Sequence, residues 1–129
     1  MTDGPRVLLA EDDRILRKAG ETTLRRKGYS VIPAVDGEEA LAKALEHKPD
    51  LILLDVMMPK MQGFDVLARL KSDASTRDIP VIMLSNLEQE SDIRRSIEGG
   101  ACSYLVKSNV QLDELAERVA EALNEKGRD

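Results

Sequence analysis

The sequence predicts a single α/β domain in which helices cover both faces of a parallel sheet. The chain has 129 residues, of which 42% are hydrophobic and 33% charged, which is typical of one globular domain. Five short apolar runs alternate with segments of helical period. The central run, Leu51–Leu54, is apolar at four consecutive positions, which indicates a strand buried on both faces. We expect one domain over residues 1–129, without an output domain.

The first third of the chain predicts strand, helix and strand. Val7–Ala10 is the first apolar run. Apolar residues at helical spacing follow over Arg14–Lys27, and Gly28 is a common kind of helix end. Ser30–Ala34 is a short second strand. Its Pro33 has no N–H group, so we expect this strand at an edge of the sheet.

The middle of the chain repeats the pattern. Asp36 and Glu39 have the spacing of a capping box, and the helix that follows them ends near Pro49. The third strand is Leu51–Leu54. The next helix has an apolar stripe formed by Phe64, Leu67 and Leu70, and a polar loop over residues 72–78 follows it.

The last third adds two strands and two helices. Val81–Leu84 is the fourth strand, and a weakly apolar helix over Glu88–Glu98 ends at a pair of glycines. Tyr104–Val106 is the fifth strand. The final helix has the clearest period in the chain, at Leu112, Leu115, Ala116, Val119 and Leu123.

This alternation of strands and helices predicts the strand order. Right-handed βαβ crossovers place helices on both faces of the sheet. For five strands, the flavodoxin-like doubly wound order 2-1-3-4-5 is the leading choice. Ligands of such sheets bind beyond the carboxyl ends of the strands, at the switch point between strands 1 and 3. Any functional residues should therefore follow the strands.

Composition excludes several classes of function. The net charge of −5 and the scarcity of aromatic residues, with no Trp, argue against direct nucleic-acid binding. His47 is the single histidine, which argues against a Ser-His-Asp mechanism and a histidine-rich metal site. Cys102 is the single cysteine, which is typical of a cytoplasmic protein. No apolar run reaches 18 residues, so we expect no membrane insertion.

Reactive side chains follow four of the five predicted strands. Glu11 and Asp12 follow the first strand, Asp55 the third, Ser85 the fourth and Lys107 the fifth. In the order 2-1-3-4-5 these strands are neighbours, so their ends share one edge of the sheet. Two carboxylates about 4 Å apart repel each other by about 4 kcal/mol at an effective dielectric of 20. Oxygen ligands of this kind favour Mg²⁺, or Mn²⁺ in its place.

Each residue also has an ordinary structural reading. Asp13 is best explained as the cap of the first helix. Ser85 has the spacing of a capping box with Glu88, and a lysine at a strand end, such as Lys107, is commonly a surface residue. These readings do not explain why all the groups meet at one edge. Together they predict a phosphoryl-binding site, in which Asp55 is the nucleophile, Lys107 neutralises charge and Ser85 donates a hydrogen bond.

At this point the chain resembles the receiver domains of two-component response regulators. The resemblance covers roughly Arg6 to Leu123 and rests on "LLAEDD", "LILLDVMMPKMQG", "VIMLS" and "GGACSYLVK" in this order. It implies an aspartyl phosphate at Asp55. It also implies a Mg²⁺ site in which Asp12 binds directly, Glu11 acts through water and Met57 contributes its backbone carbonyl. Ser85 and Tyr104 match the switch pair of the family, and Lys107 its characteristic lysine.

The resemblance also implies partners. The phosphoryl donor would be a histidine kinase or a histidine phosphotransfer protein, and the output an unidentified protein target. The domain would catalyse only its own phosphorylation and dephosphorylation, and it would be a monomer or a weak, phosphorylation-dependent dimer. The basic residues of the first helix, among them Arg14, Arg17 and Lys18, could dock a kinase or serve only as a solvated face. We expect phosphorylation to draw Ser85 inward, with Tyr104 and the fourth helix following.

Some positions depart from the family pattern, and other functions stay open. Ser108 replaces the usual proline after the lysine, which predicts a trans peptide bond and a more mobile loop. Asn86 follows the switch hydroxyl where a small residue is usual, and Lys60 and Gln62 stand where acids are common.

One alternative is a degenerate receiver that serves as an interaction module. An FMN-binding protein is less favoured, because the acidic loop after the first strand would repel a phosphate group. A phosphoester hydrolase is also less favoured, because Met57 cannot act as the general acid.

Overall fold

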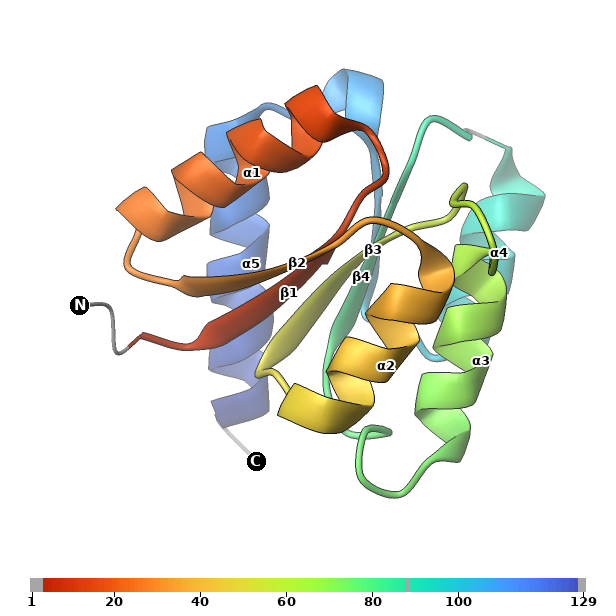
Figure 1. Ribbon diagram of the computed structural model, residues 1–129. Helices are drawn as coiled ribbons and strands as arrows, with labels where there is room; N and C mark the ends of the chain where they lie inside the picture. The colour runs from red at the N-terminus through yellow and green to blue at the C-terminus, as the bar shows by residue number, and fades with distance from the viewer. Residues whose placement is uncertain (1–3, 88, 128–129) are drawn as a thin grey trace.

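The computed structural model describes residues 4–87 and 89–127, and it contains the predicted parallel sheet (Figure 1). The five strands lie in the order β2-β1-β3-β4-β5, and every neighbouring pair is parallel. This confirms the predicted order and places each strand within one residue of its predicted bounds. The strands are β1 Arg6–Ala10, β2 Ser30–Ala34, β3 Leu51–Asp55, β4 Val81–Ser85 and β5 Ser103–Val106.

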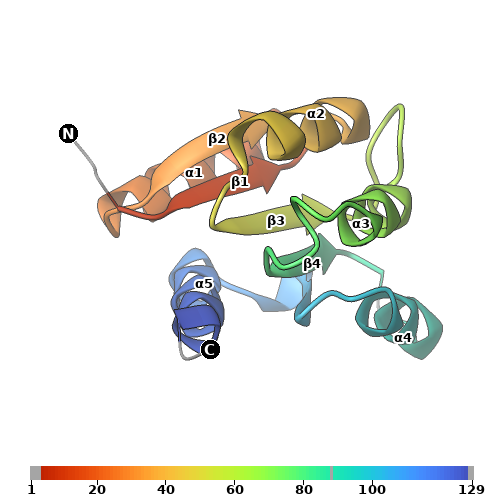
Figure 2. The same ribbon diagram turned by 90° about the horizontal axis from the view of Figure 1, so that it is seen from below.

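Helices cover both faces of this sheet, with α1 and α5 on one face and α2, α3 and α4 on the other (Figures 1 and 2). No helix in the described ranges is long and apolar enough to cross a membrane. The helices are α1 Arg14–Arg26, α2 Gly37–His47, α3 Gly63–Ser72, α4 Glu90–Glu98 and α5 Leu112–Gly127, with a short 3₁₀ helix, η1, at Lys107–Asn109.

Two hydrophobic clusters explain why the strands lack polar alternation. Leu8, Ile52 and Met83 point to the side of α2 and α3, where they pack in one cluster with Leu67. Their neighbours along the strands pack on α1 and α5 in the second cluster, together with Leu24. Each face of the central strands is therefore buried, as the apolar run of β3 predicts.

The outer edge of β2 is closed to further strands. Pro33 offers no N–H group there, and its carbonyl accepts a hydrogen bond of 2.6 Å from Lys43 Nζ. The Val35 N–H group donates to Glu39 Oε1 at 2.8 Å. The side chain of Glu39 thus accepts from Val35. The backbone N–H group of Glu39 donates to Asp36 Oδ1, so Asp36 caps α2 as predicted. Proline and charged side chains of this kind block pairing with a second chain.

Two details differ from the predictions. α4 begins at Glu90 with Gln89 as its N-cap, not at position 88, which lies outside the described residues. Ser85 is therefore the last residue of β4 and not a helix cap, so the capping explanation of this residue is wrong. The 3₁₀ turn η1 after β5 was not predicted, because three residues are too few to have a period.

Candidate functional site

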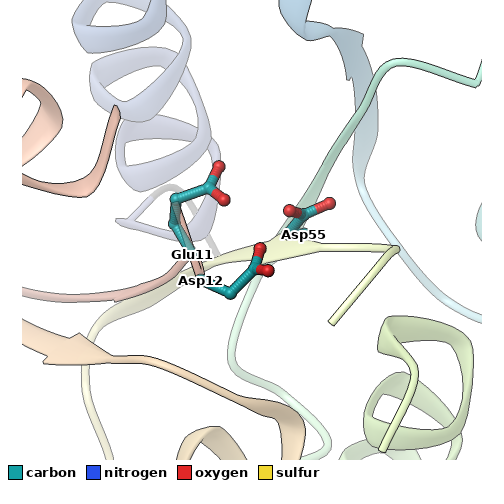
Figure 3. Close-up of side chains that lie close together, drawn as sticks. All are labelled: Glu11, Asp12 and Asp55. Carbon is teal, nitrogen blue, oxygen red and sulfur yellow. The ribbon is translucent and has the colours of Figure 1, made fainter. Parts of the chain in front are cut away.

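Acidic side chains from the ends of β1 and β3 converge at one edge of the sheet (Figure 3). Glu11 and Asp12 follow β1, and Asp55 is the last residue of β3. One carboxylate oxygen from each of the three residues lies within 4.8 Å of the others. Since β1 and β3 are hydrogen-bonded neighbours, the parallel pairing itself brings together residues that are more than forty positions apart.

Asp55 is held in one orientation by two donors. Its side chain is almost fully buried. Oδ1 accepts a hydrogen bond from the Met57 N–H group at 3.0 Å, and Oδ2 accepts one from Lys107 Nζ at 2.7 Å. Gly63 allows the chain to return past the strand end, because a Cβ atom there would lie 2.3 Å from the Asp55 carbonyl oxygen. The Asp55 carboxylate is thus held in a defined position by the protein itself.

Glu11 and Asp12 differ in exposure and in contacts. Glu11 is buried; its Oε2 accepts a hydrogen bond from the Asp13 N–H group at 3.0 Å, and its Oε1 pairs with Lys107. Asp12 is exposed. Asp13 caps α1 by accepting hydrogen bonds from the N–H groups of Ile15 and Leu16, as predicted. The solvent-exposed acid of the pair is therefore Asp12.

Lys107 links the acids of the two strands. Its ammonium group contacts Asp55 Oδ2 at 2.7 Å and Glu11 Oε1. Burial opposes the charge of this lysine, but the hydrogen bonds to Asp55 and Glu11 outweigh that effect, and the pKa of Lys107 is raised above its usual value. Lys107 is therefore a cation at neutral pH. Among the described residues there is no cis peptide bond, in agreement with the trans bond expected before Ser108.

Ser85 and Tyr104 meet at a residue next to the site. The Ser85 hydroxyl oxygen accepts a hydrogen bond from the Leu87 N–H group at 3.1 Å. The Tyr104 hydroxyl group donates to the Leu87 carbonyl oxygen at 2.8 Å. Burial raises the pKa of Tyr104, although its hydrogen bond with Ser85 acts in the opposite direction. Ser85 and Tyr104 thus hold the loop between β4 and α4 through the N–H group and the carbonyl group of Leu87.

The donor set fits a hard divalent cation. The three clustered ligands are all carboxylates, and they approach one another closely enough to share one ion. Carboxylate oxygens without His or Cys suit Mg²⁺ or Mn²⁺. The backbone of Met57 lies at the site, where its N–H group contacts Asp55.

The prediction for helix α1 needs a correction at one residue. The sequence predicts Arg17 among the basic residues of an exposed face, but it is half-buried. Its Nη1 atom donates to the Glu11 carbonyl oxygen at 2.9 Å and to the Asp12 carbonyl oxygen at 3.4 Å. Helical period does not indicate this contact, because Arg17 follows Glu11 and Asp12 by six and five positions, beyond the three- and four-residue spacing of side chains that meet on a helix.

Comparison with known proteins agrees with this architecture. The family model described as "Response regulator receiver domain" matches residues 7–120. A gliding motility regulatory protein of Myxococcus xanthus is 44% identical over 114 residues, which is 88% of this chain and 15% of that protein. Protein PilG of Pseudomonas aeruginosa is 36% identical over 106 residues, which is 82% of this chain and 78% of that protein.

Other relatives are longer than this chain. The DNA-binding dual master transcriptional regulator RpaA of Synechocystis is 40% identical over 96% of this chain, but this covers 51% of RpaA. The chain thus spans 15% and about half of the lengths of the first two relatives. DNA binding is named for RpaA, and the shared region here is the receiver part alone.

Solved structures show the same fold. A CheY-like response regulator receiver domain from Methanospirillum hungatei superimposes with a TM-score of 0.90 at 27% identity, covering 96% of this chain and 97% of that one. The receiver domain of the Francisella response regulator 1452 gives a TM-score of 0.88 at 31% identity, covering 95% and 98%. The matched family model, the strand order and the acidic cluster at the strand ends lead to one conclusion: this chain belongs to the response regulator receiver domains, the signalling domains of two-component systems.

Proposed function

We propose that Asp55 accepts a phosphoryl group from a histidine kinase or a histidine phosphotransfer protein. The observation that supports this most strongly is the contact of Asp55 with Lys107, beside the acids that follow β1. The degenerate-receiver alternative would not need this set of groups. A phosphoryl-accepting role explains all of them.

The transfer is a nucleophilic displacement at phosphorus. An oxygen of the Asp55 carboxylate attacks the phosphorus atom, and the P–N bond of the donor phosphohistidine breaks. The electron pair of that bond returns to the imidazole ring, which leaves, and an aspartyl phosphate forms. Lys107 is placed to balance the negative charge of the phosphoryl oxygens as they approach. The domain would catalyse only this reaction and the hydrolysis of its own phosphate.

The acids that follow β1 and β3 would hold Mg²⁺, with Mn²⁺ as a substitute. Asp12 is the best direct ligand because it is exposed and its carboxylate lies with those of Glu11 and Asp55. Glu11 would act through water, since both of its oxygens are engaged by Lys107 and Asp13. Asp55 and the Met57 backbone carbonyl would complete the set. When bound, such an ion neutralises the negative charge of the carboxylates and of the transferring phosphoryl group.

Intact mass after incubation with acetyl phosphate and Mg²⁺ tests the acceptor. We expect the wild-type protein to gain one phosphoryl group, and Asp55→Asn to gain none. Asp65→Asn is the matched control, because Asp65 is exposed on α3, and it should be modified like the wild type. The proposal fails if the wild type stays unmodified or if Asp55→Asn is modified to the same extent.

Phosphorylation would act on the loop between β4 and α4. Shifting a two-state element from 1:99 to 99:1 takes about 5.5 kcal/mol, and a hydrogen bond to a charged group contributes about 1.5–3 kcal/mol. Two or three new bonds from Ser85, Lys107 and a backbone N–H group would suffice. If Ser85 moves inward to donate its hydroxyl hydrogen to a phosphoryl oxygen, its contacts with Leu87 and Tyr104 would change and Tyr104 would be free to move. NMR shifts on addition of beryllofluoride should reach Leu87 and Tyr104; shifts confined to the acidic edge would contradict this.

The phosphoryl donor would approach over α1 in the cytoplasm, and an unidentified protein would read the output. Arg14 and Lys18 are exposed on α1 next to Asp13 and Ile15, so they can supply positive charge to a docking surface. Charge reversal at these two residues should slow transfer from the cognate kinase but leave the reaction with acetyl phosphate unchanged. An unchanged transfer rate from the kinase would dismiss docking through these residues.

A further inference from the structure

The turn between β1 and α1 (residues 11–13) is fastened to α1 by one side chain. Arg17 Nη1 donates to the carbonyl oxygens of both Glu11 and Asp12, at 2.9 and 3.4 Å. The guanidinium group therefore contacts the backbone of the two acids, while the side chains of these acids lie toward Asp55 (Figure 3).

The two carbonyl groups lie at a gap in the regular backbone pairing. The Glu11 N–H group still donates to Ala34, as a continuation of the sheet, and the Asp13 carbonyl already accepts from the Arg17 N–H group, as part of the helix. The carbonyls of Glu11 and Asp12 lie between these two systems, where backbone acceptors need a side chain or water as a partner. Arg17 supplies a charged donor for both.

The same turn is held at its other end by contacts of the acids themselves. The Asp13 N–H group donates to Glu11 Oε2, and Asp13 caps the first turn of α1. A change at Arg17 would release one side of this arrangement and let the backbone of Glu11 and Asp12 rotate. Glu11 would still be tied to Asp55 through Lys107, but the carboxylate of Asp12 would be less firmly placed relative to Asp55. The positive charge of Arg17 also offsets part of the repulsion among the acids.

We infer that Arg17 is a positioning residue for the cation site: it orients Glu11 and Asp12 through their backbone carbonyls without binding the ion. This inference rests on the proposed metal-dependent function. Partners behind metal ligands commonly change affinity by about 10–100-fold when they are removed. Because Arg17 acts through the backbone, we expect the lower end of this range, about tenfold, which corresponds to about 1.4 kcal/mol.

A titration of the protein with Mn²⁺, followed by electron paramagnetic resonance, measures binding of the metal alone. Arg17→Gln should weaken Mn²⁺ binding about tenfold. Arg26→Gln is the matched control, because it removes the same charge from an exposed position of the same helix, and it should bind Mn²⁺ like the wild type. Arg17→Lys keeps the charge but replaces the planar guanidinium group by a compact ammonium group, which does not reproduce the placement of Nη1 against both carbonyl oxygens, and it should weaken binding in the same direction. Amide hydrogen exchange without metal gives a second readout: the Asp13 N–H group should exchange faster in Arg17→Gln.

The outcomes separate this inference from the proposed function. If the wild type binds no Mn²⁺, or if Asp12→Asn binds it as tightly as the wild type, the proposed metal-dependent function and the inference about Arg17 are both overturned. If the wild type binds Mn²⁺ through Asp12 but folded Arg17→Gln and Arg17→Lys bind it as tightly as Arg26→Gln, only the inference about Arg17 is overturned. A lower thermal stability of Arg17→Gln with unchanged Mn²⁺ affinity would also overturn it, because that result assigns Arg17 a purely structural role.

Discussion

Replacing Asp12 by asparagine should stabilise the metal-free protein. One oxygen each of Glu11, Asp12 and Asp55 lies within 4.8 Å of the others. Two unit charges at that distance repel by about 3.5 kcal/mol at an effective dielectric of 20 and by about 0.9 kcal/mol in bulk water. Because Asp12 is exposed, the value for water is the better guide. Asp12 is repelled by Glu11 and by Asp55 and attracted by Lys107. Removing its charge should therefore raise the free energy of unfolding of Asp12→Asn by about 1 kcal/mol.

Urea unfolding followed by circular dichroism measures this difference. In EDTA the midpoint for Asp12→Asn should rise with an unchanged slope. At a Mg²⁺ concentration ten times the dissociation constant, binding raises the free energy of unfolding of the wild type by about 1.4 kcal/mol. Asp12→Asn lacks the carboxylate that binds the ion and does not gain this stability. The order of stability should therefore reverse. Added NaCl should reduce the gain in EDTA, because salt screens exposed charges.

Glu117→Gln is the control for the loss of one negative charge, since Glu117 is exposed on α5. It should change stability little under both conditions. An Asp12→Asn protein that is less stable than the wild type in EDTA would refute the reasoning. That result would mean that Asp12 makes a stabilising contact that outweighs its repulsion by Glu11 and Asp55.

Three further predictions concern other parts of the molecule. Burial raises the pKa of both tyrosines, so their contribution to stability is complete below about pH 10 and is lost as the pH rises through the raised values. The absorbance of tyrosinate measures this, and a titration at the ordinary tyrosine pKa would contradict it. Pro33→Val combined with Lys43→Ala reopens the edge of β2, so light scattering should detect more dimer or larger species; an unchanged mass would show that the edge is protected otherwise. Arg95→Gln removes a cation 4.1 Å from the centre of the Phe64 ring, a contact of about 0.5–1 kcal/mol, so amide exchange in α4 should be about two- to fivefold faster. Arg69→Gln, an exposed control on the neighbouring helix α3, should leave that exchange unchanged, and equal rates in both variants would exclude this ring contact as an anchor of α4.

The sequence by itself determined the elements and their order. The run Leu51–Leu54 indicated a strand buried on both faces, and the alternation of strands with helices predicted the crossovers. Asp13 and Asp36 could be identified as helix caps because capping is a local interaction between residues two or three positions apart. The residues of the acidic edge also followed from sequence, since the carboxyl ends of parallel strands meet at one edge of the sheet.

Only the tertiary structure decided how these side chains are paired. Lys107 contacts both Glu11 and Asp55, Arg17 turns inward to the acidic turn, and Tyr104 reaches the Leu87 carbonyl. None of these contacts has a sequence period, because each depends on the rotamer of a long side chain and on a backbone group brought near by the fold. Backbone hydrogen bonding and apolar burial repeat along the chain and can be predicted from its pattern. The pairing of single charges at the end of a sheet depends on distances of a few ångströms, which are fixed only after the strands have assembled.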